Sequence, residues 1–155
     1  MNRGIELARG EYIVRMDCDD VSDPDRFGAQ VMFMDRHPRV GAAGTFVRAC
    51  FPGGATQQWR FPTDSEALRV ALIFEPAIAH PSAILRRAWF ERHELRYRSE
   101  YARVEDWDLW RRAARHFSLS NLPRSLLDYR VHGDRMSRVH QAEQRREGLR
   151  IQGQE

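Results

Sequence analysis

Three carboxylates within four residues follow directly after a short apolar run. The run covers residues 12–16 and contains β-branched side chains, so it predicts a buried strand. The acids are Asp17, Asp19 and Asp20. Open α/β sheets bind ligands at the carboxyl ends of their strands, and carboxylate oxygens are ligands that suit Mg²⁺ or Mn²⁺. A cation held by these acids could in turn bind a diphosphate.

Two other interpretations of this stretch stay open. Strands often end in turns rich in aspartate, and the acids between Asp20 and Asp23 could simply cap the next helix. A strand followed by two acids also occurs in phosphoacceptor and phosphatase folds. The stretch alone therefore does not decide between a cation–diphosphate site and these alternatives.

The bulk composition describes an ordinary soluble domain. The chain has 155 residues, 42% of them hydrophobic and 30% charged, which is enough for one domain with a core. No apolar run approaches the roughly 20 residues of a membrane span, and no signal peptide opens the chain, so a cytoplasmic setting is expected. Cys18 and Cys50 form neither a disulfide framework nor a metal-ligand pattern.

The positive charge does not predict nucleic-acid binding. The net charge is +3, but all 25 basic residues are arginine, and they are scattered among 22 acids instead of forming one block. Small anionic ligands and lipid head groups stay open as partners.

The first half of the chain predicts elements that place the acids. Residues 1–9 predict a short helix that Gly10 ends, and it leads into the strand at 12–16. Since βαβ units place strands before such a helix, the sheet is expected to lack its opening strands. After the acids, Asp23 is the expected N-cap and Pro24 the first residue of a helix that ends at residues 37–38.

The remaining elements are expected from the same kinds of signal. They are a strand at 40–50, a loop at 51–62, a helix opened by a capping box at 63–66, an extended segment at 77–85, a short helix at 86–91, an irregular stretch at 97–102, a helix from residue 104, strands at 117–122 and 126–132, and a polar helical tail at about 136–155.

Several short motifs follow one another in a fixed order. They are residues 8–13 leading into 15–20, Pro24-x-Arg26, Gln30, His37-Pro38, His80-Pro81-Ser82 with Arg86, residues 105–110, Asn121-Leu122-Pro123 and residues 129–132. In order and spacing they resemble the family 2 glycosyltransferases, which have the GT-A fold. The resemblance covers nearly the whole chain except its last residues.

The resemblance implies a fold class and a domain organisation. The expected fold is α/β, a GT-A-like (Rossmann-like) mixed sheet flanked by helices. Residues 1–155 would form a single domain corresponding to the C-terminal part of that fold. Family members usually carry two or three further N-terminal strands, which contribute most contacts to the nucleotide base, so the chain is expected to be N-terminally truncated.

The resemblance also implies roles for individual residues. Asp17 and Asp19 take the D-x-D role, binding the metal and the nucleotide, and His132 joins the metal or diphosphate. Asp106 is the expected general base, with Glu105 as its competitor or hydrogen-bonding partner. Further residues are expected around the substrates: Arg130, Arg135 and Arg138 at a diphosphate or lipid phosphate, and His80, Ser82 and Trp107 on the acceptor side.

Each of these roles has a simpler alternative. Glu105 and Asp106 would stabilise a helix N-terminus in any case, by up to about 1 kcal/mol. His132 could be a surface histidine at a strand end, His80 a core or turn histidine, Trp107 a core aromatic residue and Arg130 a solvated side chain.

The implied activity is metal-dependent, inverting transfer of a sugar from a nucleotide diphosphate sugar to an acceptor hydroxyl. Mn²⁺ or Mg²⁺ is the expected cofactor, and a sugar or lipid-linked acceptor in cell-envelope polysaccharide or glycolipid synthesis is the expected partner. The Gln-x-x-Arg-Trp signature of processive members is not found, which favours addition of a single sugar. Two alternatives stay open: a non-catalytic remnant or binding subunit with the same fold, and another Mg²⁺-dependent phosphate enzyme such as a nucleotidyltransferase.

The expected surroundings of the protein follow from the same reasoning. The cytoplasm, or the inner face of the membrane through peripheral association, is the expected location. An incomplete sheet exposes an edge through which two copies of the chain could pair.

Overall fold

A mixed sheet forms the centre of the molecule. Its strands are β1 (Tyr12–Val14), β2 (Val21–Ser22), β3 (Val40–Cys50), β4 (Thr56–Trp59), β5 (Ile84–Arg86) and β6 (Ser118–Arg130). They lie in the order β1-β5-β3-β6-β2, with β4 paired to β3 outside this path. β3 and β6 run parallel, whereas the other pairs are antiparallel.

The computed structural model describes residues 1–131 and residue 149. The expectations for His132, Arg135, Arg138 and the helical tail at 136–155 therefore lie outside the described residues.

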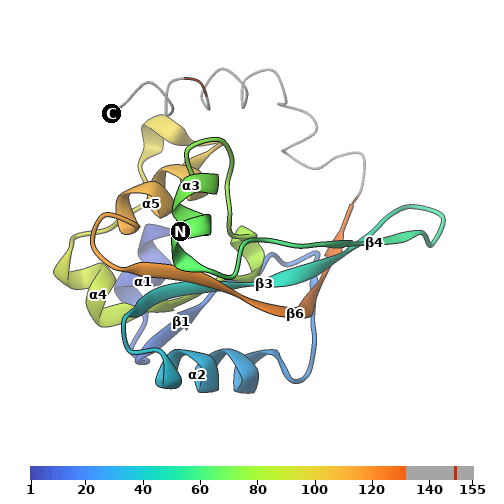
Figure 1. Cartoon of the computed structure of the whole chain (residues 1–155), viewed down its shortest axis with the longest axis horizontal. Helices are drawn as coiled ribbons and strands as arrows, with labels where there is room; N and C mark the ends of the chain where they lie inside the picture. The colour runs from blue at the N-terminus through green and yellow to red at the C-terminus, as the bar shows by residue number, and fades with distance from the viewer. Residues whose placement is uncertain (132–148, 150–155) are drawn as a thin grey trace.

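Helices cover both faces of the sheet. They are α1 (Asn2–Leu7), α2 (Arg26–Arg36), α3 (Ser65–Ala71), α4 (Arg87–Arg92) and α5 (Glu105–Ala113), with 3-10 turns η1 (His80–Ser82) and η2 (Ser99–Tyr101). α2 lies against one face, and α3 and α5 lie against the other (Figure 1). Within the described residues, no helix is both long and apolar enough to span a bilayer.

Neighbouring residues of β3 contribute to two separate halves of the core. Ala42 packs in the cluster that contains Leu109 and Trp110 of α5, whereas Ala43 packs in the cluster that contains Met34 of α2. Because successive side chains of a strand point to opposite faces, small residues here let both layers approach the sheet closely.

Close packing makes Gly44 intolerant of a side chain. A Cβ atom at this position would lie 2.4 Å from Asn121 Oδ1 and 2.8 Å from Ile78 Cγ2. We expect Gly44→Ala to lower the free energy of unfolding by about 1–3 kcal/mol, measured by urea denaturation. Gly28→Ala is the matched control, because a Cβ added at Gly28, inside α2, would have nothing within 4 Å. This change should leave the free energy of unfolding unchanged or raise it. Equal effects of the two changes would contradict this packing.

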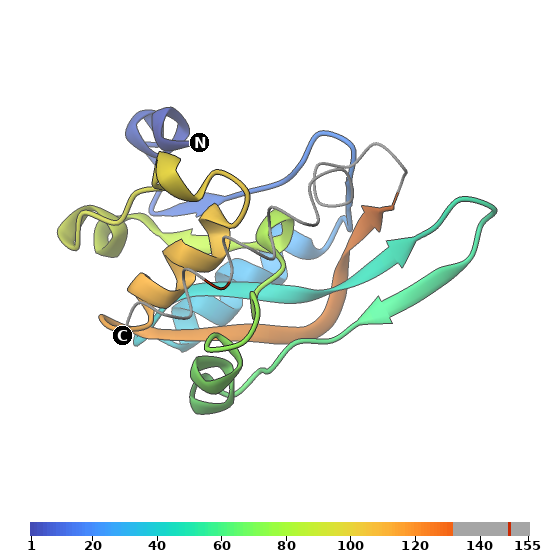
Figure 2. The same cartoon turned by 90° about the horizontal axis from the view of Figure 1, so that it is seen from above.

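The long hairpin of β3 and β4 corrects the loop predicted at 51–62. It extends beyond the rest of the molecule (Figure 2), and its turn holds Gly53 and Gly54 at positive φ. Residues 56–59 pair with β3 and so form a strand, not part of a loop. Thr56, Gln57 and Gln58 are exposed, so the strand shows no apolar alternation.

The two strands predicted at 117–122 and 126–132 are one continuous strand, β6. Leu122 pairs with Thr45 and Ser125 with Phe46, so Pro123 and Arg124 lie in a register shift. Proline is tolerated at such an irregularity because no ladder hydrogen bond requires its missing N–H.

Two helix starts also differ from prediction. α2 begins at Arg26 with Asp25 as its N-cap, after a turn in which the Asp23 carboxylate accepts a hydrogen bond from the Asp25 amide at 2.9 Å. α3 is capped by Asp64, whose side chain accepts hydrogen bonds from the amides of Glu66 and Ala67. The capping signals were therefore correct in kind but displaced by one or two residues.

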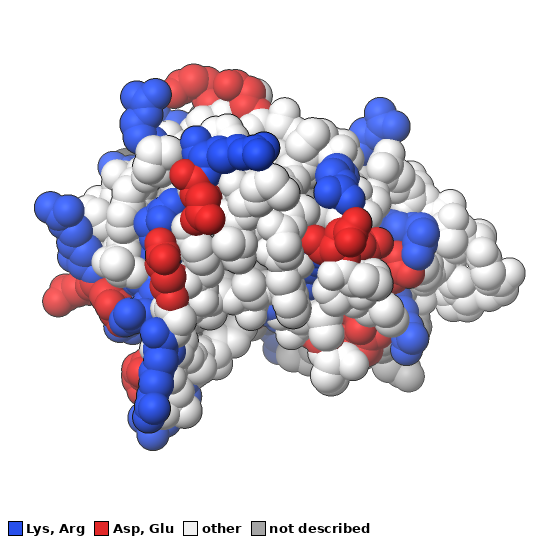
Figure 3. Space-filling view, turned by 90° about the horizontal axis from the view of Figure 1, so that it is seen from below, with Lys and Arg blue, Asp and Glu red and all other residues white. Residues whose placement is uncertain are grey.

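Acidic and arginine side chains alternate in small groups over one face of the molecule. Figure 3 shows this face, which lies underneath in the view of Figure 1. The charges there form a mixed surface in place of one extended field of a single sign.

Candidate active site

The turn after β1 gathers the three predicted acids. Ligand atoms of Asp17, Asp19 and Asp20 all lie within 4.8 Å of one another. The Asp20 amide donates to the Asp17 carbonyl at 3.3 Å, which folds the loop back on itself. Asp17 and Asp19 are partly exposed, whereas Asp20 is buried. An all-carboxylate set of this kind fits a hard divalent cation such as Mg²⁺ or Mn²⁺.

The end of β6 reaches the same cluster. The backbone amide of Arg130 donates a hydrogen bond to Asp20 Oδ1 at 3.1 Å, while the Arg130 side chain is exposed. Asp20 therefore ties the acidic loop to the strand end that leads toward His132.

Arg15 stands beside these acids and was not predicted as a site residue. Its Nη2 lies 2.6 Å from Asp17 Oδ1, and its Nη1 donates to Asp17 Oδ2 at 2.9 Å. The signal that could have identified it is a single charged residue inside the otherwise apolar run at 12–16.

Asp106 lies in the first turn of α5 and is partly buried. Its Oδ1 accepts a hydrogen bond from the Trp107 amide at 2.8 Å. Burial raises the pKa of Asp106 above that of an ordinary aspartate, while the Trp107 amide and Arg15 lower it and Asp17 raises it. The charges of Asp17 and Arg15 thus act directly on Asp106, although about 90 residues separate them in sequence. A carboxylate with a raised pKa is suited to accept a proton.

The three residues expected on the acceptor side are buried to different extents. Ser82 is fully buried, and its hydroxyl donates to the Ala79 carbonyl and accepts from the Thr45 amide. Trp107 is 6% exposed and donates from Nε1 to the Leu72 carbonyl, within the core. These two side chains are therefore held by the protein's own interior.

His80 is also buried but lies close to the site. Burial, together with the positive charge of Arg15, lowers the pKa of His80 to about 3, so the ring is neutral. Its Nε2 is 2.8 Å from the Tyr97 hydroxyl oxygen. Burial likewise raises the pKa of Tyr97, and the negative charges of Asp106 and Glu105 raise it further.

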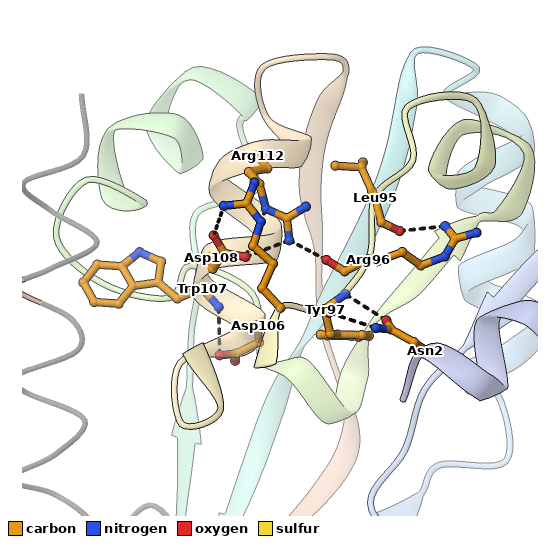
Figure 4. Close-up of polar contacts among 9 residues, drawn as sticks. Asn2, Leu95, Arg96, Tyr97, Asp106, Trp107, Asp108 and Arg112 are labelled. Atoms are coloured by element: carbon orange, nitrogen blue, oxygen red, sulfur yellow. Dashed lines mark hydrogen bonds and ion pairs between the residues drawn. The ribbon is translucent and has the colours of Figure 1, made fainter. Parts of the chain in front are cut away.

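The segment at residues 95–97 is fixed between α1 and α5 beside Asp106 (Figure 4). The Asn2 side chain donates from Nδ2 to the Tyr97 carbonyl and accepts at Oδ1 from the Tyr97 amide, each at 2.8 Å. From the other side, Arg112 donates to the Arg96 carbonyl at 2.6 Å and pairs with Asp108. Asn2 and Tyr97 were missed by sequence reasoning, because nothing in their local pattern distinguishes them.

A family comparison decides what kind of domain surrounds these residues. A family model described as Glycosyl transferase family 2 matches residues 1–94. The chain belongs to glycosyltransferase family 2. The match contains the acidic loop, Arg15 and His80, but it ends before Glu105 and Asp106, whose expected roles stay predictions.

Curated relatives of this glycosyltransferase domain match most of its length. An uncharacterized glycosyltransferase of Haemophilus influenzae is 26% identical over 160 residues, covering 97% of this chain and 50% of the relative. The putative glycosyltransferase EpsE of Bacillus subtilis is 30% identical, covering 89% and 50%. The O-antigen biosynthesis glycosyltransferase WbnJ of Escherichia coli is 28% identical, covering 85% and 52%. The chain therefore spans about half the length of the curated relatives it matches.

Solved structures confirm the predicted fold. Residues 1–349 of Staphylococcus aureus TarS in complex with UDP match with a TM-score of 0.68 at 18% identity, over 97% of this chain and 42% of that one. The complex of the same protein with UDP-GlcNAc gives a TM-score of 0.66 at 19% identity, over 84% and 38%. The predicted GT-A-like mixed sheet is thus confirmed, as part of a larger fold.

Proposed function

We propose that the domain transfers a sugar from a nucleotide diphosphate sugar to an acceptor hydroxyl, with a divalent cation and with inversion at the anomeric carbon. The observation that carries this proposal is the electrostatic effect of Arg15 and Asp17 on Asp106, although about 90 residues separate them in sequence. This coupling supports a pairing of a cation on the acidic loop with a proton acceptor on α5, which is the pair that such a transfer needs.

The residues divide the reaction between them. Asp106 takes the proton of the acceptor hydroxyl as the acceptor oxygen forms its bond to the anomeric carbon and the bond from that carbon to the diphosphate oxygen breaks. Glu105, next to it, is the alternative base. A divalent cation on Asp17 and Asp19, with His132 as a further ligand, would neutralise charge on the leaving diphosphate. Arg130, the last residue of β6, adds positive charge beside the acidic loop.

Names of related proteins support the substrate class. The TarS complexes contain UDP and UDP-GlcNAc, and two relatives are named for the biosynthesis of O-antigen and of amylovoran. A uridine diphosphate sugar is therefore the donor we propose to test first, and a sugar or lipid-linked acceptor of a cell-envelope polysaccharide is the second substrate. We also propose that the domain works at the inner face of the membrane, and that the edge of β1 opposite β5 is available for pairing with a second chain.

A second candidate function is binding of the donor without transfer, as in a non-catalytic subunit. Calorimetric titration of the chain with UDP-GlcNAc and Mn²⁺, followed by an assay for released UDP with candidate acceptors, separates the two. Binding with release supports the transferase, binding without release supports the second candidate, and no binding refutes both.

A further inference from the structure

Arg15 occupies both oxygens of a carboxylate that belongs to the cation site. Its two terminal nitrogens lie 2.6 Å and 2.9 Å from the two Asp17 oxygens, in a forked ion pair that is partly shielded from solvent. Charge-assisted, two-point contacts of this kind are among the stronger polar contacts in proteins. A cation that binds Asp17 must therefore compete with the guanidinium for the same oxygens.

The backbone of Arg15 is fastened on both sides, so only its side chain is free to rotate. The Arg15 amide donates to the Ala83 carbonyl at 3.0 Å, and the Arg15 carbonyl accepts from Arg26 Nη2 at 2.7 Å. Arg26 is fully buried and also donates to the Pro81 carbonyl at 2.9 Å. The guanidinium can thus change partner without disturbing β1 or the acidic loop.

The surroundings of Arg15 keep its charge inside the site. Its charge acts on Asp106 of α5 and on His80 of η1. His80 is neutral and does not repel it. A guanidinium displaced from Asp17 therefore stays within electrostatic reach of Asp106.

We propose that Arg15 is a substrate-binding residue that pairs with Asp17 in the metal-free protein and turns to the diphosphate of the donor when a divalent cation takes the Asp17 carboxylate. This exchange rests on the proposed function, because it requires a diphosphate at this site. Before the exchange, Arg15 offsets repulsion among Asp17, Asp19 and Asp20. Afterwards the cation repels the guanidinium and the diphosphate attracts it, and its planar fork suits phosphate oxygens.

Replacing Arg15 with methionine should change two affinities in opposite directions. Removal of the competing cation should strengthen binding of Mn²⁺ alone by about tenfold, because a hydrogen-bonded charge pair no longer has to be broken. Removal of the diphosphate ligand should weaken binding of UDP at saturating Mn²⁺ by about ten- to a hundredfold. Both constants come from isothermal titration calorimetry of the full chain.

Arg124→Met is the matched control. Arg124 is exposed and pairs with Asp25 at 3.4 Å on the surface, so its loss changes the net charge equally without touching the site. Both affinities should stay within about twofold of those of the unmodified protein. Arg15→Lys, which keeps the charge but lacks the fork, should fall between Arg15→Met and the unmodified protein on both measurements.

The outcomes separate this inference from the proposed function. If the unmodified protein binds Mn²⁺ and UDP but Arg15→Met changes neither affinity, or changes both in the same direction, the exchange is refuted and the proposed function stands. If neither protein binds Mn²⁺ or UDP, both are refuted. Should Arg15→Met not fold, the Arg15 side-chain NMR signal of the unmodified protein decides: it should shift on addition of Mg²⁺ and again on addition of UDP, and an unmoved signal overturns the exchange.

Discussion

Asp106→Asn should lower the rate of sugar transfer by about 10²- to 10⁴-fold, because the amide cannot accept the proton of the acceptor hydroxyl. The change keeps the shape of the side chain, and an asparagine oxygen can still accept the hydrogen bond from the Trp107 amide. Binding of Mn²⁺ should therefore be unchanged within about twofold, since Asp106 is not among the acids that gather after β1. The rate is measured as released UDP with the acceptor that the unmodified protein uses.

The same variant should be more stable than the unmodified protein at neutral pH. Burial raises the pKa of Asp106 in the folded state above its value in the unfolded chain, so the ionised carboxylate costs stability. The cost in stability is absent below the pKa that Asp106 has in the unfolded chain, because the carboxyl is then protonated in both states. It reaches its full size above the pKa that Asp106 has in the folded protein. The advantage of Asp106→Asn in thermal melts should thus grow as the pH rises through the folded pKa. An asparagine variant that transfers sugar at the normal rate would remove Asp106 from the mechanism.

Glu66→Gln is a suitable control for both measurements. Glu66 also lies in the first turn of a helix, α3, but its side chain is exposed and distant from the acidic loop in the chain. Neither transfer nor the pH dependence of stability should change measurably, because exposed acids of this kind contribute little.

Asp19→Asn should weaken binding of Mn²⁺ by about a hundredfold or more, and transfer should fall with it. One charged oxygen donor is lost from a set whose ligand atoms lie within 4.8 Å of one another. The fold should survive, because Asp19 is partly exposed and lies in a turn. Titration calorimetry with Mn²⁺ alone measures the effect before any substrate is added.

The surface acid Asp25 provides the comparison for Asp19. Asp25→Asn removes the same charge and breaks only an exposed ion pair with Arg124, so its Mn²⁺ affinity should match that of the unmodified protein. Equal affinities for Asp19→Asn and Asp25→Asn would show that the acidic loop does not bind the cation.

Elements with a strong local signal were predicted closely. The strand at 40–50 has the predicted bounds, since its small and apolar residues are covered on both faces. β4 was missed because it pairs with a single neighbour and has polar side chains. The break predicted in β6 reflected Pro123, which a register shift accommodates. For β4 and β6, pairing with β3 decided the outcome, and the side-chain pattern of either strand alone does not report such pairing.

The candidate site divides in the same way. Asp17, Asp19 and Asp20 are close in sequence, and their meeting followed from a strand end alone. The role predicted for Asp106 came from a family resemblance, because no rule of sequence spacing links Asp106 to the three acids. Tyr97 was missed because its partner is set by the fold: its backbone is held by Asn2, 95 residues away. Arg15 was missed although its partner Asp17 lies only two residues away.

The account depends on one cation lying between Asp17 and Asp19, in front of Asp106. The most direct measurement is a crystal structure of the chain with Mn²⁺ and UDP, with data collected at the manganese absorption edge. The account predicts an anomalous peak within coordination distance of carboxylate oxygens of Asp17 and Asp19, with the UDP diphosphate on the side that faces Asp106. A manganese peak elsewhere, or UDP bound away from this loop, would contradict it.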